Sequence, residues 1–366
     1  MRAAVLYEPN TPLKIEEVSL DGPRDGEVLV RVAATGACHS DYHVMNGDWH
    51  GPGFECPVVL GHEASGIVER VGAGVSGLKK GDHVILSFVA SCGYCSRCSR
   101  GQPHLCTSMS GGPGAMYDGS KRLKRGDLVL NHFGSGMSSF AELSCVHPSQ
   151  CVKVTPDLPL EAAALIGCAV MTGVGAVLNT AKVEPGATMA VFGTGGVGLS
   201  VVQGGVLANA GRIIAVDVRA NKLQFARGVG ATDTINAADA DPVEAIKELT
   251  GGRGVDYAFD AIGLATVSRQ CYDAVCRGGT AVVVGMAPTG QEIPIPATIA
   301  GQEKTVKGCF YGSARPPIDF VRLAQFYLSG RLKLDQMVSK KYAFTDINEA
   351  FAALARGDNA RGVIVL

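Results

Sequence analysis

Four cysteines lie within fifteen residues, at Cys92, Cys95, Cys98 and Cys106. Thiolates at such short spacings can close a tetrahedron around Zn2+. An iron–sulfur run of the ferredoxin type would place its fourth cysteine about four residues after the third and follow it with proline. Here the fourth cysteine comes eight residues later and is followed by Thr107. Disulfides are the other alternative. We predict a structural zinc, because four sulfur ligands leave no coordination position for a substrate.

A glycine-rich motif follows the apolar segment 188–192 and precedes an apolar run with helical spacing: Gly193-Thr194-Gly195-Gly196-Val197-Gly198. It matches G-x-G-x-x-G, in which the first glycine allows a tight turn and the second lets the backbone approach a pyrophosphate. The third glycine lets the helix pack closely on its strand. The pyrophosphate would lie at the helix N-terminus, where unpaired N–H groups favour an anion. An ordinary strand–helix turn is the alternative, because turns are frequent in a chain with 48 glycines.

Asp217 stands nineteen residues beyond Gly198, at the end of the next predicted strand. A carboxylate at this position accepts hydrogen bonds from the adenosine ribose and repels a 2′-phosphate. We therefore predict a site for NAD rather than NADP. The alternative for Asp217 is a surface acid at the end of a strand.

Three further segments carry thiols, imidazoles and carboxylates: Cys38-His39-Ser40-Asp41-Tyr42-His43, Gly61-His62-Glu63 and Gly167-Cys168. Their spacing alone does not bring them together. A lone cysteine in an apolar helix is more often a core residue than a metal ligand. The residues themselves therefore leave core packing and metal chemistry both open for these segments.

The elements that must position these residues change character along the chain. The first 150 or so residues predict short strands between turns, as at 27–32, 66–71 and 83–86. Residues 160–179 are rich in alanine and leucine and predict buried helical structure. Strands and helices then alternate through 188–192, 212–216, 255–260, 266–275 and 280–284, which indicates a parallel sheet covered by helices. A helix over 347–354 and a strand over 362–366 end the chain.

Composition narrows the class of protein. A chain of 366 residues that is 46% hydrophobic and 18% charged has room for two domains and is not disordered. The formal net charge of −1 gives no basic excess for a nucleic acid. Apolar runs are interrupted well before roughly 18 residues, so we expect no membrane span. The N-terminus reaches Glu8 before any apolar core could develop, so it predicts a strand rather than a secretory signal. We expect a cytoplasmic protein, whose reducing surroundings disfavour disulfides.

Taken together, these motifs resemble the zinc-dependent medium-chain alcohol dehydrogenases, the group of the animal-liver and class III types. The resemblance runs nearly from end to end, through the 38–43 segment, Gly-His-Glu, the four cysteines, Ile166-Gly167-Cys168, the glycine motif and Arg361. It implies an α/β protein with a β-rich, GroES-like, zinc-binding catalytic domain over 1–169 and 311–366. A Rossmann domain with a doubly wound parallel sheet, over 170–310, would bind NAD.

The resemblance also implies a second, catalytic zinc held by Cys38, His62 and Cys168, with a fourth position open for water or substrate. Two zinc ions per chain are therefore expected. Asp41 resembles the carboxylate that orients the ligand histidine. Glu63 resembles the family acid that lies behind the zinc and helps ligand exchange.

Other positions match the family's proton relay and its cofactor contacts. Ser40 and His43 match the relay, although a surface histidine that caps a turn is the alternative for His43. Contacts to NAD are implied for Thr172 near the nicotinamide, Lys222 near the adenosine ribose, and Arg361. His39 stands where the liver enzymes have an arginine against the pyrophosphate, so we expect a weaker contact there. No residue of 107–125 clearly matches the arginine with which class III enzymes hold the glutathione carboxylate, which disfavours a glutathione adduct as substrate.

The implied chemistry is oxidation of an alcohol. An alcohol bound to Zn2+ has its pKa lowered from about 16 towards neutrality. Its proton would leave through the Ser40 hydroxyl, then the cofactor ribose, to His43, because imidazole titrates near physiological pH. Alignment to the family places four residues around the substrate: Trp49, Phe88, Phe133 and Met286. They suit a primary aliphatic, allylic or aromatic alcohol, with plain core packing as the alternative for each.

Rival functions are a nicotinoprotein that keeps its NAD bound, a dehydrogenase for a thiol–formaldehyde adduct, and a non-catalytic NAD(H)-binding sensor. The sensor has no need of Cys38, His62, Cys168, Ser40 and His43 together. The expected partners are therefore a small-molecule alcohol or aldehyde, and neither nucleic acid nor membrane. An edge strand near 305–309 could pair with a second copy and give a homodimer. Core packing is the default for Cys56, Cys145, Cys151, Cys271, Cys276 and Cys309.

Overall fold

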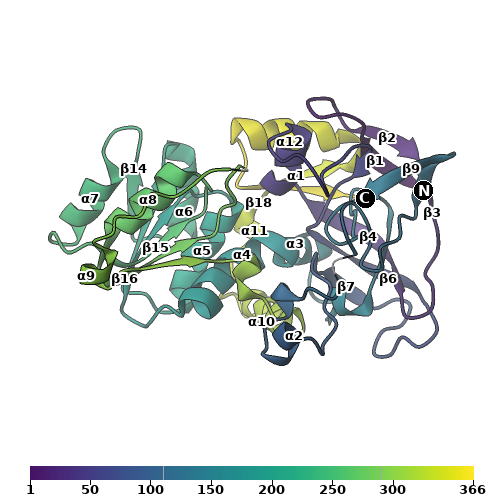
Figure 1. The fold of residues 1–366 in the computed structure, drawn as a ribbon, viewed down its shortest axis with the longest axis horizontal. Coiled ribbons are helices and arrows are strands. Elements are labelled where there is room, and N and C mark those ends of the chain that lie inside the picture. Colours follow the sequence, from purple (N-terminus) through teal and green to yellow (C-terminus); the bar gives the residue numbers. More distant parts are fainter. Residues whose placement is uncertain (110, 289) are drawn as a thin grey trace. The chain divides into compact units, whose positions relative to one another are not determined.

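The computed structural model describes residues 1–109, 111–288 and 290–366, and the chain divides into two compact units (Figure 1). Unit 1 comprises Met1–Cys168 and Arg315–Leu366, and unit 2 comprises Ala169–Ala314. The boundaries expected from the sequence, after residue 169 and before residue 311, lie close to these.

Unit 1 contains two sheets built from short strands. The first has the order β2-β1-β5-β9-β8-β3. Its strands are β1 (Arg2–Leu6), β2 (Lys14–Glu17), β3 (Ser19–Leu20), β5 (Val58–Val59), β8 (Leu123–Arg125) and β9 (Leu128–His132). The second has the order β11-β7-β6-β4-β19-β18, with β10 also paired to β4. Its strands are β4 (Val28–Gly36), β6 (Ala64–Val71), β7 (His83–Leu86), β10 (Leu143–Val146), β11 (Cys151–Val154), β18 (Val338–Ala343) and β19 (Arg361–Val365).

The last strand returns the chain to unit 1. β19 pairs antiparallel with β4, so the two ends of the sequence share one sheet. Helix α12 (Ile347–Arg356) precedes it and buries Ile347, Ala350 and Phe351, the i, i+3, i+4 spacing of an amphipathic helix. Gly357 ends this helix in a left-handed conformation with φ 70°, which a residue with a Cβ adopts at a cost. The predicted helix and strand are both confirmed, at Ile347–Arg356 and Arg361–Val365.

The other helices of unit 1 are short or lie near its C-terminal end. They are α1 (His39–Met45), α2 (Ser96–Ser99), α3 (Leu160–Leu165), α10 (Pro316–Leu328) and α11 (Leu334–Met337). Single helical turns lie at η1 (Pro103–Leu105), η2 (Pro148–Gln150) and η6 (Phe344–Asp346). Two of these short elements, α1 and α2, begin directly after Cys38 and Cys95.

One long helical segment, 160–181, contains α3, η3 (Ile166–Val170), α4 (Met171–Gly175) and η4 (Ala176–Ala181). Both η3 and η4 are π-helical, a geometry that often marks functional positions. By length and composition alone this segment could cross a membrane. However, 83% of its most apolar eighteen-residue window is buried inside the protein, as in a core helix.

Unit 2 is a six-stranded sheet with the order β14-β13-β12-β15-β16-β17, and all its strand pairs are parallel. The strands are β12 (Thr188–Phe192), β13 (Arg212–Asp217), β14 (Asp233–Asn236), β15 (Val255–Asp260), β16 (Val275–Val283) and β17 (Thr305–Gly308). The helices are α5 (Gly196–Leu207), α6 (Ala220–Val229), α7 (Pro242–Leu249), α8 (Ala265–Ala274) and α9 (Ile299–Gln302), with the turn η5 (Tyr311–Ser313). The predicted doubly wound sheet is confirmed, and β17 is an edge strand.

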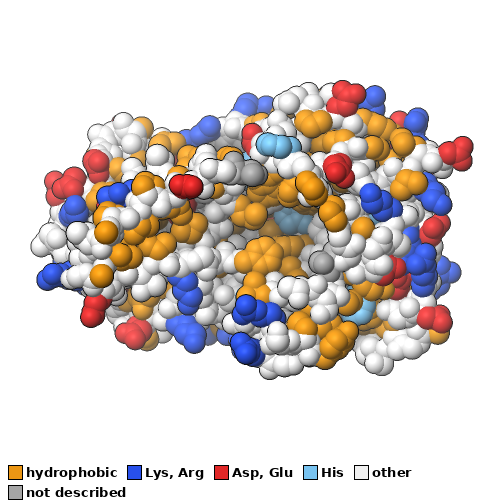
Figure 2. Space-filling view, in the orientation of Figure 1, with side chains coloured by type: hydrophobic (Ala, Val, Ile, Leu, Met, Phe, Trp, Pro, Cys, Tyr) orange, Lys and Arg blue, Asp and Glu red, His pale blue; other side chains and the backbone are white. Residues whose placement is uncertain are grey.

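The surface mixes charges of both signs. On the face drawn in Figure 2, Lys and Arg side chains are interspersed with Asp and Glu side chains. This distribution agrees with the near-zero net charge of the sequence. All twelve cysteines are free thiols.

Candidate active site and metal centres

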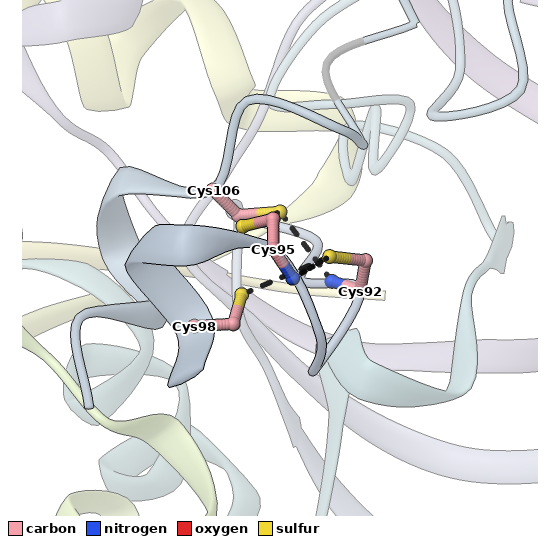
Figure 3. A group of neighbouring side chains, drawn as sticks. All are labelled: Cys92, Cys95, Cys98 and Cys106. Carbon is pink, nitrogen blue, oxygen red and sulfur yellow. Dashed lines mark hydrogen bonds between the residues drawn. The ribbon is translucent and has the colours of Figure 1, made fainter. Parts of the chain in front are cut away.

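The four cysteines of the 92–106 loop converge on one point (Figure 3). Their sulfur atoms all lie within 4.8 Å of one another, with Cys92 Sγ 4.0 Å from Cys98 Sγ and Cys95 Sγ 3.9 Å from Cys106 Sγ. Four sulfurs held at about 2.3 Å from a zinc ion lie about 3.8 Å apart in a tetrahedron. The loop therefore has the spacing that a tetrahedral zinc requires.

The backbone of this loop prepares the sulfurs to bind a cation. The Cys95 N–H donates to Cys92 Sγ at 3.3 Å, and the Cys92 N–H donates to Cys106 Sγ at 3.4 Å. Donation from the Cys98 amide lowers the pKa of the Cys95 thiol to about 6. Since amide donors stabilise thiolates, the donor set fits a closed structural zinc.

A second cluster brings together residues from three separate segments of unit 1. Cys38 lies between β4 and α1, His62 lies between β5 and β6, and Cys168 lies in the π-helical turn η3. One ligand atom from each lies within 4.8 Å of the others, and all three residues are buried. The Cys168 thiol donates to Cys38, and with the nearby His62 charge this places the pKa of Cys38 well below its usual range.

Asp41 fixes the orientation of the His62 ring. Its Oδ1 lies 3.1 Å from His62 Nδ1 and also accepts the Gly61 N–H at 2.9 Å. With Nδ1–H donating to this carboxylate, Nε2 carries the lone pair. Within the described part of the chain, buried Nε2 has no hydrogen-bond partner. Two thiols and an imidazole with an unpartnered nitrogen fit a Cys2His zinc site that keeps one position open.

Glu63 and Arg361 form a buried ion pair next to this cluster. Arg361, the first residue of β19, donates to Glu63 Oε2, and the two side chains are 3% and 0% exposed. Burial raises the pKa of Glu63 to about 7, against the opposing effect of the Arg361 charge. The guanidinium predicted to contact NAD is therefore held by a carboxylate adjacent to His62.

The predicted relay residues lie on α1. Ser40 and His43 are three residues apart on this helix, so their side chains share one face. The His43 side chain is 23% exposed, whereas Ser40 is half-buried. His39, at the first position of the helix, is exposed, and its ring centroid lies 6.3 Å from that of His43.

A series of aromatic rings runs from His62 to His43. Phe88 and Phe133 approach the His62 ring edge-on, with centroids 5.6 Å and 5.5 Å away. Phe54 lies 6.4 Å from Phe133 and 5.5 Å from Trp49, and Trp49 stacks on His43 at 5.0 Å. Three of the four predicted pocket residues thus belong to one aromatic series. The fourth, Met286, lies in unit 2 and is 55% exposed.

Unit 2 presents the glycine motif at the end of β12. Gly193 has φ 88°, and Gly198 approaches so closely that an added Cβ would lie 1.7 Å from Gly193 O. An added Cβ at Gly195 would meet no atom within 4 Å, which leaves room for a pyrophosphate. Gly196 and Val197 open helix α5 behind this turn.

Asp217 ends β13 beside this turn. Its Oδ2 accepts the Thr194 N–H at 2.8 Å and the Thr194 hydroxyl at 3.0 Å, and its Oδ1 accepts the Arg219 N–H. The carboxylate is thereby fixed at the carboxyl end of β13, where a ribose would lie. Lys222, on α6, and Thr172, on α4, are both half-buried in the same unit.

Two residues near the site were missed by the sequence analysis. Asp48 lies 2.9 Å from the His43 ring, and Phe54 completes the aromatic series. Both lie in the loop after α1, where no periodic pattern indicates which side chains turn inward. An acid five residues after His43 is the only sequence signal for Asp48.

Comparison with known proteins covers both units. A family model described as an alcohol dehydrogenase GroES-like domain matches residues 24–157, and one described as a zinc-binding dehydrogenase matches 196–329. The chain is 40% identical over 372 residues to an NDMA-dependent alcohol dehydrogenase from Amycolatopsis methanolica, with 100% of this chain and 98% of that protein covered. It is 39% identical over 367 residues to an S-(hydroxymethyl)glutathione dehydrogenase from Escherichia coli O1:K1, with 99% of each covered.

A solved structure to which the chain is similar is benzyl alcohol dehydrogenase from Acinetobacter calcoaceticus. Its TM-score is 0.93 at 35% identity, with 100% of this chain and 99% of that chain covered. The matches confirm the GroES-like and Rossmann folds, and zinc and NAD as cofactors. The chain belongs to the zinc-dependent medium-chain alcohol dehydrogenase family and is an oxidoreductase that acts on CH–OH groups.

Proposed function

We propose that this enzyme oxidises an apolar primary alcohol to its aldehyde, reversibly, at the cluster of Cys38, His62 and Cys168. The observation that carries the proposal is the convergence of these three buried ligands within 4.8 Å. Zinc held there would lower the pKa of an alcohol towards neutrality, and NAD would accept the hydride. Asp41 would orient His62, and Glu63 with Arg361 would lie behind the ligands.

The proton of the alcohol would leave along α1. The Ser40 hydroxyl can accept one proton while donating another. His43, on the same helix face and partly exposed, would pass the proton to solvent. The two residues therefore perform a proton transfer in this proposal and do not bind zinc.

The aromatic series supports an apolar substrate. Phe88 and Phe133 flank His62, so an alcohol bound next to this ligand would have rings beside its carbon chain. Trp49 extends the apolar surface away from the ligand cluster. Aliphatic, allylic and aromatic alcohols all suit such a surface. We keep Met286 as a proposed pocket residue of unit 2.

NAD would be held by unit 2. The turn Gly193–Gly198 would receive the pyrophosphate at the N-terminus of α5, and Asp217 would accept the ribose hydroxyls. Thr172, Lys222, His39 and Arg361 are the further proposed contacts. The exposed edge strand β17 would pair with a second copy to form a homodimer, and we expect the enzyme in the cytoplasm.

The second candidate substrate is a thiol–formaldehyde adduct, because one relative is named an S-(hydroxymethyl)glutathione dehydrogenase. The pairing of two described arginines in the 107–125 segment argues against glutathione itself. Arg122 is 1% exposed and bound to Glu27 and Asp118, and Arg125 pairs with Glu16 at 3.0 Å. Both guanidinium groups of the segment are therefore already paired with carboxylates of the chain.

The test is the rise in reduced-nicotinamide absorbance when the zinc-loaded enzyme meets NAD and ethanol, hexanol, geraniol or benzyl alcohol. Each alcohol is tested with and without a zinc chelator. We expect a chelator-sensitive rate that grows with the apolar size of the alcohol. If no alcohol gives a rate, the same enzyme is tested with an alcohol and an unrelated aldehyde together. Exchange between the two would identify an enzyme that keeps its NAD bound, the alternative suggested by the NDMA-dependent relative.

A further inference from the structure

A carboxylate holds one ring nitrogen of the relay histidine. Asp48 Oδ2 lies 2.9 Å from His43 Nδ1, near the start of the loop that follows α1. The Asn46 amide donates to the same oxygen at 3.3 Å. Asp48 itself is 41% exposed, so its carboxylate lies at the boundary between the ring and solvent.

The backbone of this loop is fixed against the helix it follows. Gly47 has φ 78° and donates its N–H to Val44 O at 3.2 Å, which reverses the chain. The Trp49 N–H then donates to His43 O at 3.2 Å. Asp48, between these two bonds, is thereby placed beside the imidazole.

The plane of the His43 ring is fixed as well. The Trp49 ring stacks on it with a centroid distance of 5.0 Å and an interplanar angle of 26°. Trp49 is 8% exposed and packs in the core of unit 1, so its ring restricts the rotation of the imidazole that stacks on it. The His39 ring is a further titratable group nearby, with its centroid 6.3 Å from that of His43.

We propose that Asp48 is a positioning residue of the relay, which holds His43 with its proton on Nδ1 and its lone pair on Nε2. A neutral imidazole has one donor and one acceptor nitrogen, and a carboxylate can only accept. Asp48 therefore selects the Nδ1–H form. The proton from the substrate would arrive at Nε2 and leave from Nε2 to water, while Nδ1 keeps its own proton throughout.

This inference rests on the proposed relay and deepens it. Without Asp48, the His43 ring could carry its proton on either nitrogen. A ring protonated on Nε2 cannot accept a proton there, so only part of the enzyme would be ready for each turnover. The expected loss is in kcat, because the side-chain contacts of Asp48 are with His43 and Asn46 and not with the three ligand residues.

The test compares Asp48→Ala and Asp48→Glu with a matched control, Glu55→Gln. Glu55 is an exposed acid of the same loop, and its substitution also removes one negative charge. The first readout is the imidazole 15N spectrum of histidine-labelled, zinc-loaded enzyme, with His43 assigned by its loss in His43→Gln. The second is kcat and KM for benzyl alcohol. Neither readout depends on the other.

We expect one Nδ1–H form of His43 in the wild type and a mixture of both forms in Asp48→Ala. The kcat of Asp48→Ala should fall about fivefold to tenfold, with KM within about twofold of the wild-type value. Asp48→Glu should recover most of the Nδ1–H form and most of kcat. Glu55→Gln should match the wild type in both readouts. An Asp48→Ala enzyme with the wild-type spectrum and kcat would overturn the proposal, and so would an equal loss in Glu55→Gln. Wild-type kcat in His43→Gln would instead overturn the relay of the proposed function.

Discussion

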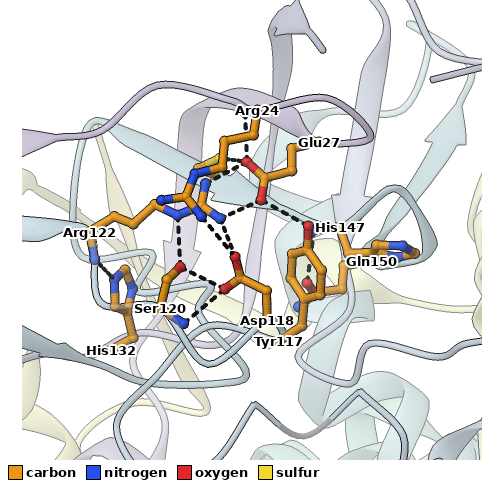
Figure 4. A network of polar contacts seen from close by, with 10 residues as sticks. Arg24, Glu27, Tyr117, Asp118, Ser120, Arg122, His132, His147 and Gln150 are labelled. Carbon is orange, nitrogen blue, oxygen red and sulfur yellow. Dashed lines mark hydrogen bonds and ion pairs between the residues drawn. The ribbon is translucent and has the colours of Figure 1, made fainter. Parts of the chain in front are cut away.

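Arg122 and Glu27, 95 residues apart in the chain, form a two-bond ion pair inside unit 1 (Figure 4). Arg122 Nη1 and Nη2 donate to the two oxygens of Glu27 at 2.5 Å and 2.6 Å. The arginine also donates to Asp118 at 2.6 Å, and Tyr117 donates its hydroxyl to Glu27 at 2.8 Å. The pair thus ties the 117–122 segment to the residues before β4.

Removal of one partner of this pair is expected to be costly. Arg122→Met leaves Glu27 buried without its counter-charge, which typically costs about 3–5 kcal/mol. Glu27→Leu combined with Arg122→Met removes both charges and should lose less than the single variant. The free energy of unfolding is measured by urea titration. Lys80→Ala, which breaks an exposed pair with Glu69, is the control and should cost under about 1 kcal/mol. A double variant less stable than Arg122→Met would contradict this account.

The same pair predicts a loss of stability in acid. Burial alone would raise the pKa of Glu27, but hydrogen bonds led by Arg122 lower it from an ordinary 4.5 to about 2. Burial is likewise outweighed at Asp118, where bonds from Ser120 and Arg122 lower the pKa to about 2. The unfolded chain then binds more protons, so this stability is present above about pH 4.5 and lost as the pH falls towards 2.

The measurement is the thermal midpoint of the wild type and of Arg122→Met from pH 7 to pH 2.5. We expect the difference between the two thermal midpoints to narrow below about pH 4.5. Protonation of Glu27 removes from the wild type the ion-pair stabilisation that Arg122→Met already lacks. A gap that stays constant over this range would show that the pair does not set the acid response.

Local patterns predicted the elements of unit 2 well. The strands at 188–192 and 255–260 have the predicted bounds, since apolar runs between turn residues define them. The strand predicted at 280–284 begins earlier, at Val275, because Val275 pairs with Val255 across a bulge in the sheet. Such pairing depends on a distant strand, which a local pattern does not record.

The two predicted ligand sets also differ in whether local sequence patterns could predict them. The 92–106 cysteines are close in sequence, so their spacing alone predicts the site that the structure assembles. Cys38, His62 and Cys168 are far apart in the sequence, and only the family resemblance predicted that they form one site. The burial of Arg122 had no sequence signal, since an arginine is ordinarily exposed. Its counter-charge lies on a segment that only the fold brings near.

The two ligand sets predict separable losses of zinc. Cys38→Ser should lose the catalytic metal and the activity together, while the 92–106 loop keeps its own ion. Cys98→Ser should also lose one of two ions but lower the thermal midpoint, because that zinc closes a loop. Zinc content per chain, turnover and midpoint are measured for each. A Cys38→Ser enzyme that still holds two zinc ions would refute the ligand assignment.

The relay predicts a defect without metal loss. Ser40→Ala should slow alcohol oxidation on the order of tenfold while both zinc ions remain, because the substrate proton loses its first acceptor. Ser19→Ala, an exposed serine on β3, serves as the matched control. Turnover and zinc content are compared in parallel, and an unchanged rate in Ser40→Ala would remove the serine from the proton path.

The aromatic series predicts that substitution of Phe54, which sequence patterns did not indicate, raises KM more for a large alcohol than for a small one. Phe54 is half-buried between Trp49 and Phe133, so Phe54→Ala opens a gap in the middle of the series. A contact between the Phe54 ring and the ring of benzyl alcohol would be worth about 0.5–1.5 kcal/mol. Its loss corresponds to roughly a twofold to twelvefold rise in KM for benzyl alcohol. Ethanol is too short to reach beyond the rings that flank His62, so its KM should stay within about twofold. Phe326→Ala, a half-buried ring on α10 that contacts Arg331 instead, is the control. Equal changes for both alcohols would mean that Phe54 supports the fold and does not border the substrate.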